Sequence, residues 1–400
     1  MTDSVYDDLD VPEVINATGT KTRIGGSLIR PEAADAMRRA AEGFARISDL
    51  QARASELIQD VTGAQAGYVA SGASACMTLA AAACIAGDDP AAMASLPDTE
   101  GLADEIVVPR THRTGYDHAY RVAGAELVDV GANDAYLGTG AENTERWEIE
   151  AAIGADTAAV AYVQKEYTTP PLEAVVEVAH DNDVPVIVDA AAELPPVENL
   201  ERFIDLGVDL VAFSGGKAIR GPQTTGILAG REDLIRSVAA QQLDMHAAAD
   251  AWVPPAELVD VDALGGVPRQ GIGRGMKVGK GELVGLIRAL ELFVEEDHEA
   301  RTAEWRDRAE RIAEELADEP ALSTSLAAAS ATDVAPTVTV SVDEAEAPVT
   351  TAELVRGLRE ENPRIFVGAD ALDQAQFTIN PMCLPDEQVA YVLDRIRDRV

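Results

Sequence analysis

The stretch "VAFSGGKAIRGPQTTGILAG", residues 211–230, decides the fold of this chain. It consists of an apolar strand pattern, a glycine-rich turn that contains Lys217, and a second apolar strand pattern. Lysine is rare here, since arginine supplies all but five of the 32 basic residues. An ammonium group can lose its proton and attack a carbonyl to form a Schiff base, whereas a guanidinium group stays protonated. The turn therefore predicts Schiff-base chemistry at Lys217.

Apolar runs on both sides of this turn alternate with alanine-rich helical patterns. We expect strands at 66–70, 105–109, 125–130, 158–163, 184–190, 208–214 and 224–230, with helices between several of them, such as 73–87 and 171–182. Strands that are apolar throughout and joined by helices are typical of a mostly parallel sheet covered on both faces. The fold class is therefore predicted to be α/β.

The character of the sequence changes near both ends. Residues 1–30 are expected to form an N-terminal arm with loop character, and residues 31–280 the large domain. A long amphipathic helical stretch begins near residue 281 and opens a small C-terminal α+β domain, residues 281–400. In that domain we expect strands at 335–343, 364–368 and 376–380 and helices near 351–361 and from about 385.

Asp189 ends a predicted strand, as Lys217 follows one. In an open parallel sheet, ligands bind beyond the carboxyl ends of the strands. A lysine that forms a Schiff base and an aspartate that holds a pyridinium nitrogen are what a protein contributes to pyridoxal phosphate chemistry. The alternative is that Asp189 caps a helix and pairs with Lys217 on the surface. Either residue alone favours that alternative, but the two together favour a cofactor site.

A phosphate site is predicted where the strand 66–70 meets the following helix. Ser71, Gly72, Ala73 and Ser74 open this helix, and its exposed N–H groups and dipole can hold a dianion. The same residues are also compatible with an ordinary helix N-cap. Ser214, three residues before the lysine, is a further predicted phosphate ligand.

Five segments together resemble a known family. They are "VINATGT" (14–20), "GYVASGASA" (67–75), "VIVDAAAELPP" (186–196), "FSGGKAIRGPQTTGIL" (213–228) and "GRGMKVGK" (273–280). These segments closely match the selenocysteine-synthase-like group of pyridoxal phosphate enzymes, which includes seryl-tRNA selenium transferase and D-glucosaminate 6-phosphate ammonia-lyase. The resemblance implies the aspartate-aminotransferase fold (fold type I), with Lys217 as the Schiff-base lysine, Asp189 as the pyridine-nitrogen partner and residues 71–74 as the phosphate cup. It also implies a homodimer or larger assembly with shared active sites.

Further site residues follow from the resemblance. His112 is expected to stack on the cofactor ring, the alternative being a solvated loop histidine, and Gln223 is expected to help bind the phosphate. The expected anchors for a substrate carboxylate or phosphate are Arg23, Arg113, Arg220, Arg274 and Lys277. An exposed lysine at a helix start is the alternative for Lys277. The sequence "HRTGYDH" lacks a second cluster with ligand spacing, so no metal site is expected.

The expected reaction is α,β-elimination, in which a small anionic amino acid or amino-sugar acid loses ammonia. Lys217, once released, would remove the α-proton. Because the "INATGT" segment starts at residue 15, we expect this chain to lack the N-terminal tRNA-binding domain of bacterial selenium transferases. The alternatives are a selenium transferase, an aminotransferase or racemase, and a catalytically dead pyridoxal phosphate-binding protein.

Charge limits the partners and the environment of the chain. The net charge is −38, and the 70 acidic residues are spread along the whole sequence. Such a lysine-poor, acidic composition predicts adaptation to high salt, where ions screen the repulsion. It also argues against nucleic acid as a partner, because phosphate contacts need basic patches.

The sequence also indicates a compartment. It shows neither an apolar run long enough to cross a membrane nor a secretory signal. Cys76, Cys84 and Cys383 are expected to be buried thiols, so we expect a cytoplasmic enzyme.

Overall fold

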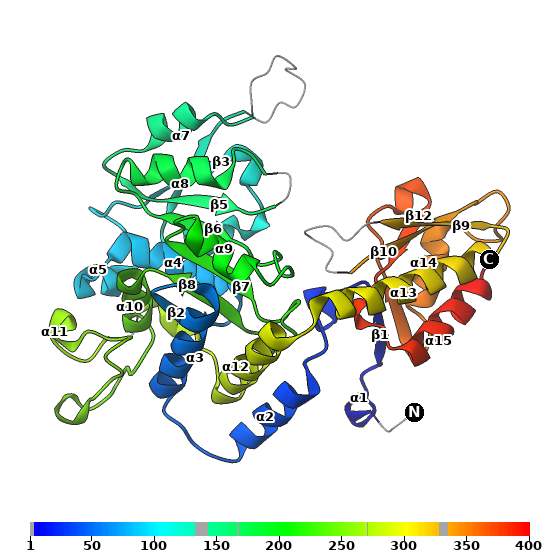
Figure 1. Cartoon of the computed structure of the whole chain (residues 1–400), viewed down its shortest axis with the longest axis horizontal. Helices are drawn as coiled ribbons and strands as arrows, with labels where there is room; N and C mark the ends of the chain where they lie inside the picture. The colour runs from blue at the N-terminus through cyan, green and yellow to red at the C-terminus, as the bar shows by residue number, and fades with distance from the viewer. Residues whose placement is uncertain (1–3, 133–142, 166–167, 270, 328–334) are drawn as a thin grey trace. The chain divides into compact units, whose positions relative to one another are not determined.

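The computed structural model describes residues 4–132, 143–165, 168–269, 271–327 and 335–400, and it divides into two compact units (Figure 1). Residues 29–295 form the larger unit, and residues 4–28 with 296–400 form the smaller one. The boundary differs from the predicted one near residue 280, because helix α12 (Lys280–Glu295) packs against α2 (Pro31–Ala41) and α3 (Ile47–Thr62) of the larger unit.

A seven-stranded sheet forms the centre of the larger unit, in the order β2-β8-β7-β6-β5-β3-β4. The strands are β2 (Ala66–Ala70), β3 (Glu105–Pro109), β4 (Glu126–Val130), β5 (Thr157–Val163), β6 (Val186–Asp189), β7 (Leu210–Ser214) and β8 (Gly226–Gly230). Within the described sheet only β8 runs antiparallel to its two neighbours. The predicted mostly parallel sheet is therefore confirmed.

Helices cover both faces of this sheet. On one face lie α4 (Ala73–Ala86), α6 (His118–Val122) and α10 (Glu232–Ala240); α4 is alanine-rich and packs on β5 to β8. On the other face lie α3, α8 (Leu172–His180) and α9 (Asn199–Asp205). The second face leaves little space at Gly67, where an added Cβ would lie 2.5 Å from Cγ2 of Ile58 on α3. The close approach of α3 to β2 explains why a glycine occupies this position in the packed core.

The remaining elements of the larger unit are short. They are α5 (Pro90–Ser95), α7 (Arg146–Ala152), α11 (Val261–Leu264) and the 3-10 turns Arg110–His112, Gly115–Asp117, Ala249–Ala251 and Ile272–Met276.

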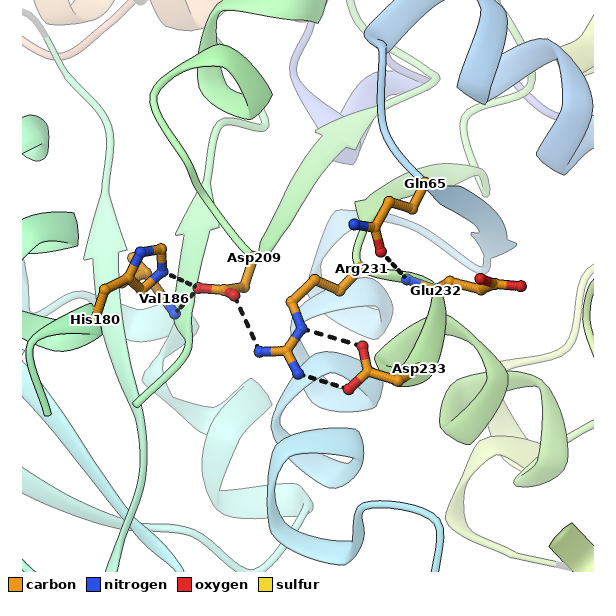
Figure 2. Close-up of polar contacts among 7 residues, drawn as sticks. All are labelled: Gln65, His180, Val186, Asp209, Arg231, Glu232 and Asp233. Atoms are coloured by element: carbon orange, nitrogen blue, oxygen red, sulfur yellow. Dashed lines mark hydrogen bonds and ion pairs between the residues drawn. The ribbon is translucent and has the colours of Figure 1, made fainter. Parts of the chain in front are cut away.

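The Asp209 carboxylate ties the amino ends of the central parallel strands together (Figure 2). Its Oδ2 accepts from the Val186 N–H at 2.8 Å and lies 2.9 Å from His180 Nε2, while Oδ1 accepts from Arg231 Nη1 at 3.2 Å. Val186 begins β6, Asp209 precedes β7 and Arg231 follows β8. This cluster therefore fixes the spacing of the strands whose opposite ends carry the candidate site.

The smaller unit is an α+β structure. Its sheet has the order β12-β10-β9 and is antiparallel, with β9 (Leu322–Ala327), β10 (Thr337–Val342) and β12 (Gln376–Ile379). The described helices and turns are α1 (Val5–Asp8), α13 (His298–Ala317), α14 (Thr351–Leu358), α15 (Asp386–Arg397), Thr22–Ile24, Leu372–Gln374 and Pro381–Cys383. The predicted α+β character agrees with these elements.

One sequence prediction for this unit was wrong. The arm expected to be a loop contains β1 (Val14–Ala17), which pairs in parallel with β11 (Arg364–Val367) from the far end of the chain. The predicted helical stretch is present and consists of α12 in the larger unit and α13 in this one, because Asp297 caps α13 by accepting a hydrogen bond from the Ala300 N–H. Strand β9 was not predicted at all.

Two features of the described chain bear on its environment. None of its helices has the length and apolar composition that a membrane span needs. All three cysteines are free thiols, with Cys76 and Cys383 buried and Cys84 half-buried rather than buried as expected.

Candidate active site

Six strands of the described large sheet end at the same edge. Strands β3, β4, β5, β6 and β7 are parallel, and β2 runs in the same direction because both β2 and β7 are antiparallel to β8. The segments that follow these strands therefore gather at one carboxyl edge, which is where open α/β sheets bind ligands. The residues placed there are Ser71–Ser74, His112, Lys165, Asp189 and Lys217.

Asp189 lies at this edge as the last residue of β6. Its Oδ1 accepts a hydrogen bond of 3.0 Å from the Ala191 N–H. Burial raises the pKa of the Asp189 carboxyl, and the Ala191 N–H and the positive charges of Lys217 and Lys165 partly oppose this increase in pKa. A carboxylate that is withdrawn from water and lies near an amine suits a cationic ring nitrogen as its partner.

Glycines shape the turn that carries Lys217. The Gly215 N–H donates to the Thr225 carbonyl at 2.9 Å, and the Gly221 N–H donates to the Gly215 carbonyl at 2.8 Å. A Cβ at Gly216 would lie 2.5 Å from Cα of Gln223. The turn thus closes on itself, holds Lys217 half-buried and brings the backbone of Gln223 against Gly216, the residue before the lysine.

The predicted phosphate cup is an open helix terminus. Gly72 is the N-cap of α4 with a φ of 110°, and the Ser71 N–H donates to the Met276 carbonyl at 3.1 Å. A Cβ at Gly226 would lie 2.3 Å from the carbonyl carbon of Gly72 and 2.5 Å from the nitrogen of Ala73. Ser214 pairs with Gly226 in the sheet, so it lies next to this terminus. The N–H groups and the dipole of a 14-residue helix suit a phosphate.

His112 follows β3 and is 1% exposed, so the alternative of a solvated loop histidine is wrong. Its Nδ1 accepts from the Val163 N–H at 3.3 Å, which leaves Nε2 to donate to the Thr169 carbonyl at 3.0 Å. The ring of Tyr162 meets it edge to face, with 4.5 Å between centroids. Burial lowers the pKa of His112 to about 4. The side chain is therefore a neutral imidazole held in a fixed orientation.

Three of the five expected substrate anchors lie in the Lys217 turn or beside the phosphate cup. Arg274 and Lys277 flank Met276, whose carbonyl binds Ser71, so both belong to the segment beside the phosphate cup. Arg220 follows Lys217 in the glycine-rich turn and adopts a φ of 57°.

The other two expected anchors are placed differently. Arg113 pairs with Asp117 at 2.5 Å and also with Asp129, so its charge is already compensated. Arg23 lies exposed in the smaller unit.

Sequence reasoning missed a second pair of charged groups at this edge. Lys165 follows β5, and its Nζ lies 2.9 Å from Oε1 of Glu193, four residues after Asp189. The rarity of lysine, which identified Lys217, applies equally to Lys165. In the described part of the chain, no group of three or more His, Cys, Asp or Glu side chains is placed to hold a metal ion.

The mostly parallel sheet, the smaller α+β unit and the lysine–aspartate arrangement at the carboxyl edge define a fold type I pyridoxal phosphate enzyme. The family profile described as SelA, L-seryl-tRNA selenium transferase, matches residues 14–252. The chain belongs to this family.

Two relatives match nearly the full chain. D-glucosaminate-6-phosphate ammonia lyase of Salmonella typhimurium is 31% identical over 100% of this chain and 98% of its own length. A solved structure of D-glucosaminate-6-phosphate ammonia-lyase superposes with a TM-score of 0.82 at 30% identity, covering 100% of this chain and 98% of that one. The 5'-C-glycyluridine monooxygenase-decarboxylase of a Streptomyces species is 29% identical over 98% of this chain and 91% of its own. The predicted family, fold class and enzyme class, a pyridoxal phosphate-dependent lyase, are confirmed.

Proposed function

We propose that this protein is an ammonia-lyase that acts on a small anionic amino acid or amino-sugar acid by α,β-elimination. The observation that carries the proposal is the half-buried Asp189 carboxyl, which lies within the electrostatic influence of Lys217 at the carboxyl edge of the sheet. Full-length similarity to an ammonia-lyase for D-glucosaminate 6-phosphate supports this substrate class.

The residues present fit pyridoxal phosphate. Bound there, the cofactor supplies a ring that accepts electrons from the substrate carbon next to the amine. Lys217 attaches the cofactor and, once displaced, accepts the proton from that carbon at Nζ. Asp189 would keep the proton on the ring nitrogen, and His112 would stack on the ring.

The phosphate end of the cofactor has its own set of residues. Ser71, Gly72, Ala73, Ser74, Ser214 and Gln223 hold it. Because a Cβ at Gly226 would collide with the backbone of Gly72, this cup requires a glycine behind it. This tight packing behind the helix terminus supports a phosphate-binding site rather than an ordinary helix N-cap.

For the substrate anion we propose Arg220, Arg274 and Lys277, which belong to segments at this edge. Arg23 and Arg113 are retained as proposed anchors, and Arg113 would first have to be released from its two carboxylates. Cationic groups at these positions select an acidic substrate over a neutral one.

We also propose that the enzyme is a cytoplasmic homo-oligomer with shared active sites and that it works at high salt. Free cysteines support a reducing compartment. A net charge of −38 supports salt adaptation and weighs against the selenium transferase alternative, since tRNA binding needs basic patches. A gel shift with bulk tRNA at low and high salt tests this last point, and tight binding would favour the transferase.

The deciding experiment begins with an absorbance spectrum in high salt, before and after borohydride. We expect an absorbance band that is lost on reduction and a pyridoxyl group on the Lys217 peptide by mass spectrometry. Ammonia and a keto acid should then appear from D-glucosaminate 6-phosphate. Lys280→Ala, at an exposed backbone contact outside the site, serves as the matched control for Lys217→Ala. A protein that stays colourless with added cofactor would favour the catalytically dead alternative, and an amino-group transfer without elimination would favour the aminotransferase.

A further inference from the structure

Lys165 and Glu193 form an ion pair to which no role has yet been given. Lys165 comes two residues after β5, and Glu193 comes four residues after the end of β6. The adjacent Gln164 N–H donates to the Asp189 carbonyl at 3.0 Å, so this segment is attached to the strand end that carries Asp189. The pair is therefore part of the same edge as the proposed cofactor site.

Both partners are held in place by their own segments. The Lys165 N–H donates to Thr168 Oγ1 at 3.1 Å, and that hydroxyl donates back to the Lys165 carbonyl at 2.8 Å. The Glu193 N–H donates to the Ala190 carbonyl at 3.1 Å, and Asn199 Nδ2 donates to the Glu193 carbonyl at 2.6 Å. The backbone positions of both residues are thus fixed, and the 2.9 Å contact between Lys165 Nζ and Glu193 Oε1 places the ammonium.

The pair is withdrawn from water and has no net charge. The Lys165 side chain is 18% exposed and that of Glu193 6%. Burial raises the pKa of the Glu193 carboxyl, and its hydrogen bond to Lys165 opposes that increase in pKa. A site that only attracts an anion needs net positive charge, which this pair lacks. An ammonium group that a carboxylate holds at a defined place is instead positioned to donate a hydrogen bond to a leaving oxygen.

Elimination of a hydroxyl group needs two proton transfers. One proton leaves the α-carbon, and another must reach the departing oxygen, because hydroxide is a poor leaving group. Lys217 takes the first. The imidazole of His112 is neutral with both nitrogens engaged, and arginine does not deprotonate. Of the other two described amines at this edge, Lys277 is proposed to bind the substrate anion, so Lys165 is assigned the second transfer.

Building on the proposed lyase function, we propose that Lys165 is the general acid that protonates the leaving hydroxyl, and that Glu193 is the positioning residue that holds it. The C–O bond breaks with its electron pair on oxygen, and a proton passes from Lys165 Nζ to that oxygen, which leaves as water. Lys217 holds the α-proton. The unsaturated amine that is released takes up water and gives the keto acid and ammonia. Lys165 regains its proton from solvent.

The test separates the two proton transfers with D-glucosaminate 6-phosphate in D2O. Exchange of the α-proton reports on Lys217, and release of ammonia reports on elimination. For Lys165→Met we expect elimination to fall by about 10²–10⁴-fold while exchange stays within about twofold. Lys165→Arg should behave alike, since it keeps the charge and the pairing with Glu193 but cannot donate a proton. Glu193→Gln should lower elimination and spare exchange.

Folding and cofactor binding are checked apart from turnover. The melting temperature of Lys165→Arg and the mass of its borohydride-reduced Lys217 peptide should match wild type, as they should for the control Lys280→Met. Equal elimination by wild type and Lys165→Arg, or a parallel loss of exchange and elimination, would overturn the role of Lys165 alone. A wild-type protein that binds no cofactor at Lys217 or eliminates nothing would overturn the proposed function and this inference with it.

Discussion

Substituting Gly226→Ala tests whether the amino terminus of α4 is the phosphate cup. The new Cβ would lie 2.3 Å from the carbonyl carbon of Gly72 and 2.5 Å from the nitrogen of Ala73. Carbon atoms in contact lie about 3.5 Å apart, so the cup must retreat by about 1 Å. Forcing an extra methyl group into a packed site costs about 1–3 kcal/mol. Misplacing a binding group by about 1 Å costs up to about 10²-fold, so we expect cofactor affinity to fall about 10–100-fold.

The assay is a titration of cofactor-free protein with pyridoxal phosphate, followed by absorbance, with the melting temperature measured in parallel. Gly154→Ala is the matched control, because nothing lies within 4 Å of its added Cβ and it precedes β5 at the opposite edge. The control should bind cofactor as wild type does. A folded Gly226→Ala protein with wild-type affinity would refute the placement of the phosphate at this helix terminus.

Three further predictions follow from the site and the surface. Lys217→Ala should abolish the adduct that borohydride reduces and lower elimination by at least about 10³-fold. Peptide mass mapping measures the adduct and an ammonia assay measures elimination; normal turnover by the variant would show that the lysine is misassigned. His112 has a pKa of about 4 in the folded protein, below its unfolded value, so its contribution is complete above pH 7 and is lost as the pH falls. The loss amounts to about 3 kcal/mol of unfolding free energy between pH 7 and 4. In urea titrations, the unfolding free energy of His112→Gln should therefore fall by about 3 kcal/mol less than that of wild type over this range. Equal pH profiles of the two proteins would contradict the assignment. Because the net charge is −38, the melting temperature should rise with potassium chloride up to molar concentrations, and a salt-independent value would exclude salt adaptation.

Local patterns allowed much of the fold to be predicted. Strands β2 and β3 begin and end where the apolar runs do, and α4 begins at Ala73 as expected. The turn around Lys217 was recognisable because only glycine tolerates the close approach to Gln223 that it makes. These features depend on short-range sterics and on the periodicity of apolar residues, which a sequence displays directly.

Pairings between distant segments could not be predicted in the same way. Strand β1 was read as a loop because its hydrogen-bonding partner, β11, lies at the other end of the chain. Likewise, Arg113 is one of many arginines until its two carboxylate partners are seen.

The sequence alone therefore determined the α/β class, the family and the two residues, Asp189 and Lys217, on which the proposed chemistry depends. Tertiary structure alone decided that β8 runs antiparallel, that His112 is buried as a neutral imidazole, and that Lys165 meets Glu193 across 28 residues. The physical reason is that charge pairing and burial depend on which strands become neighbours. That choice is made by packing of the whole sheet, and no single segment encodes it.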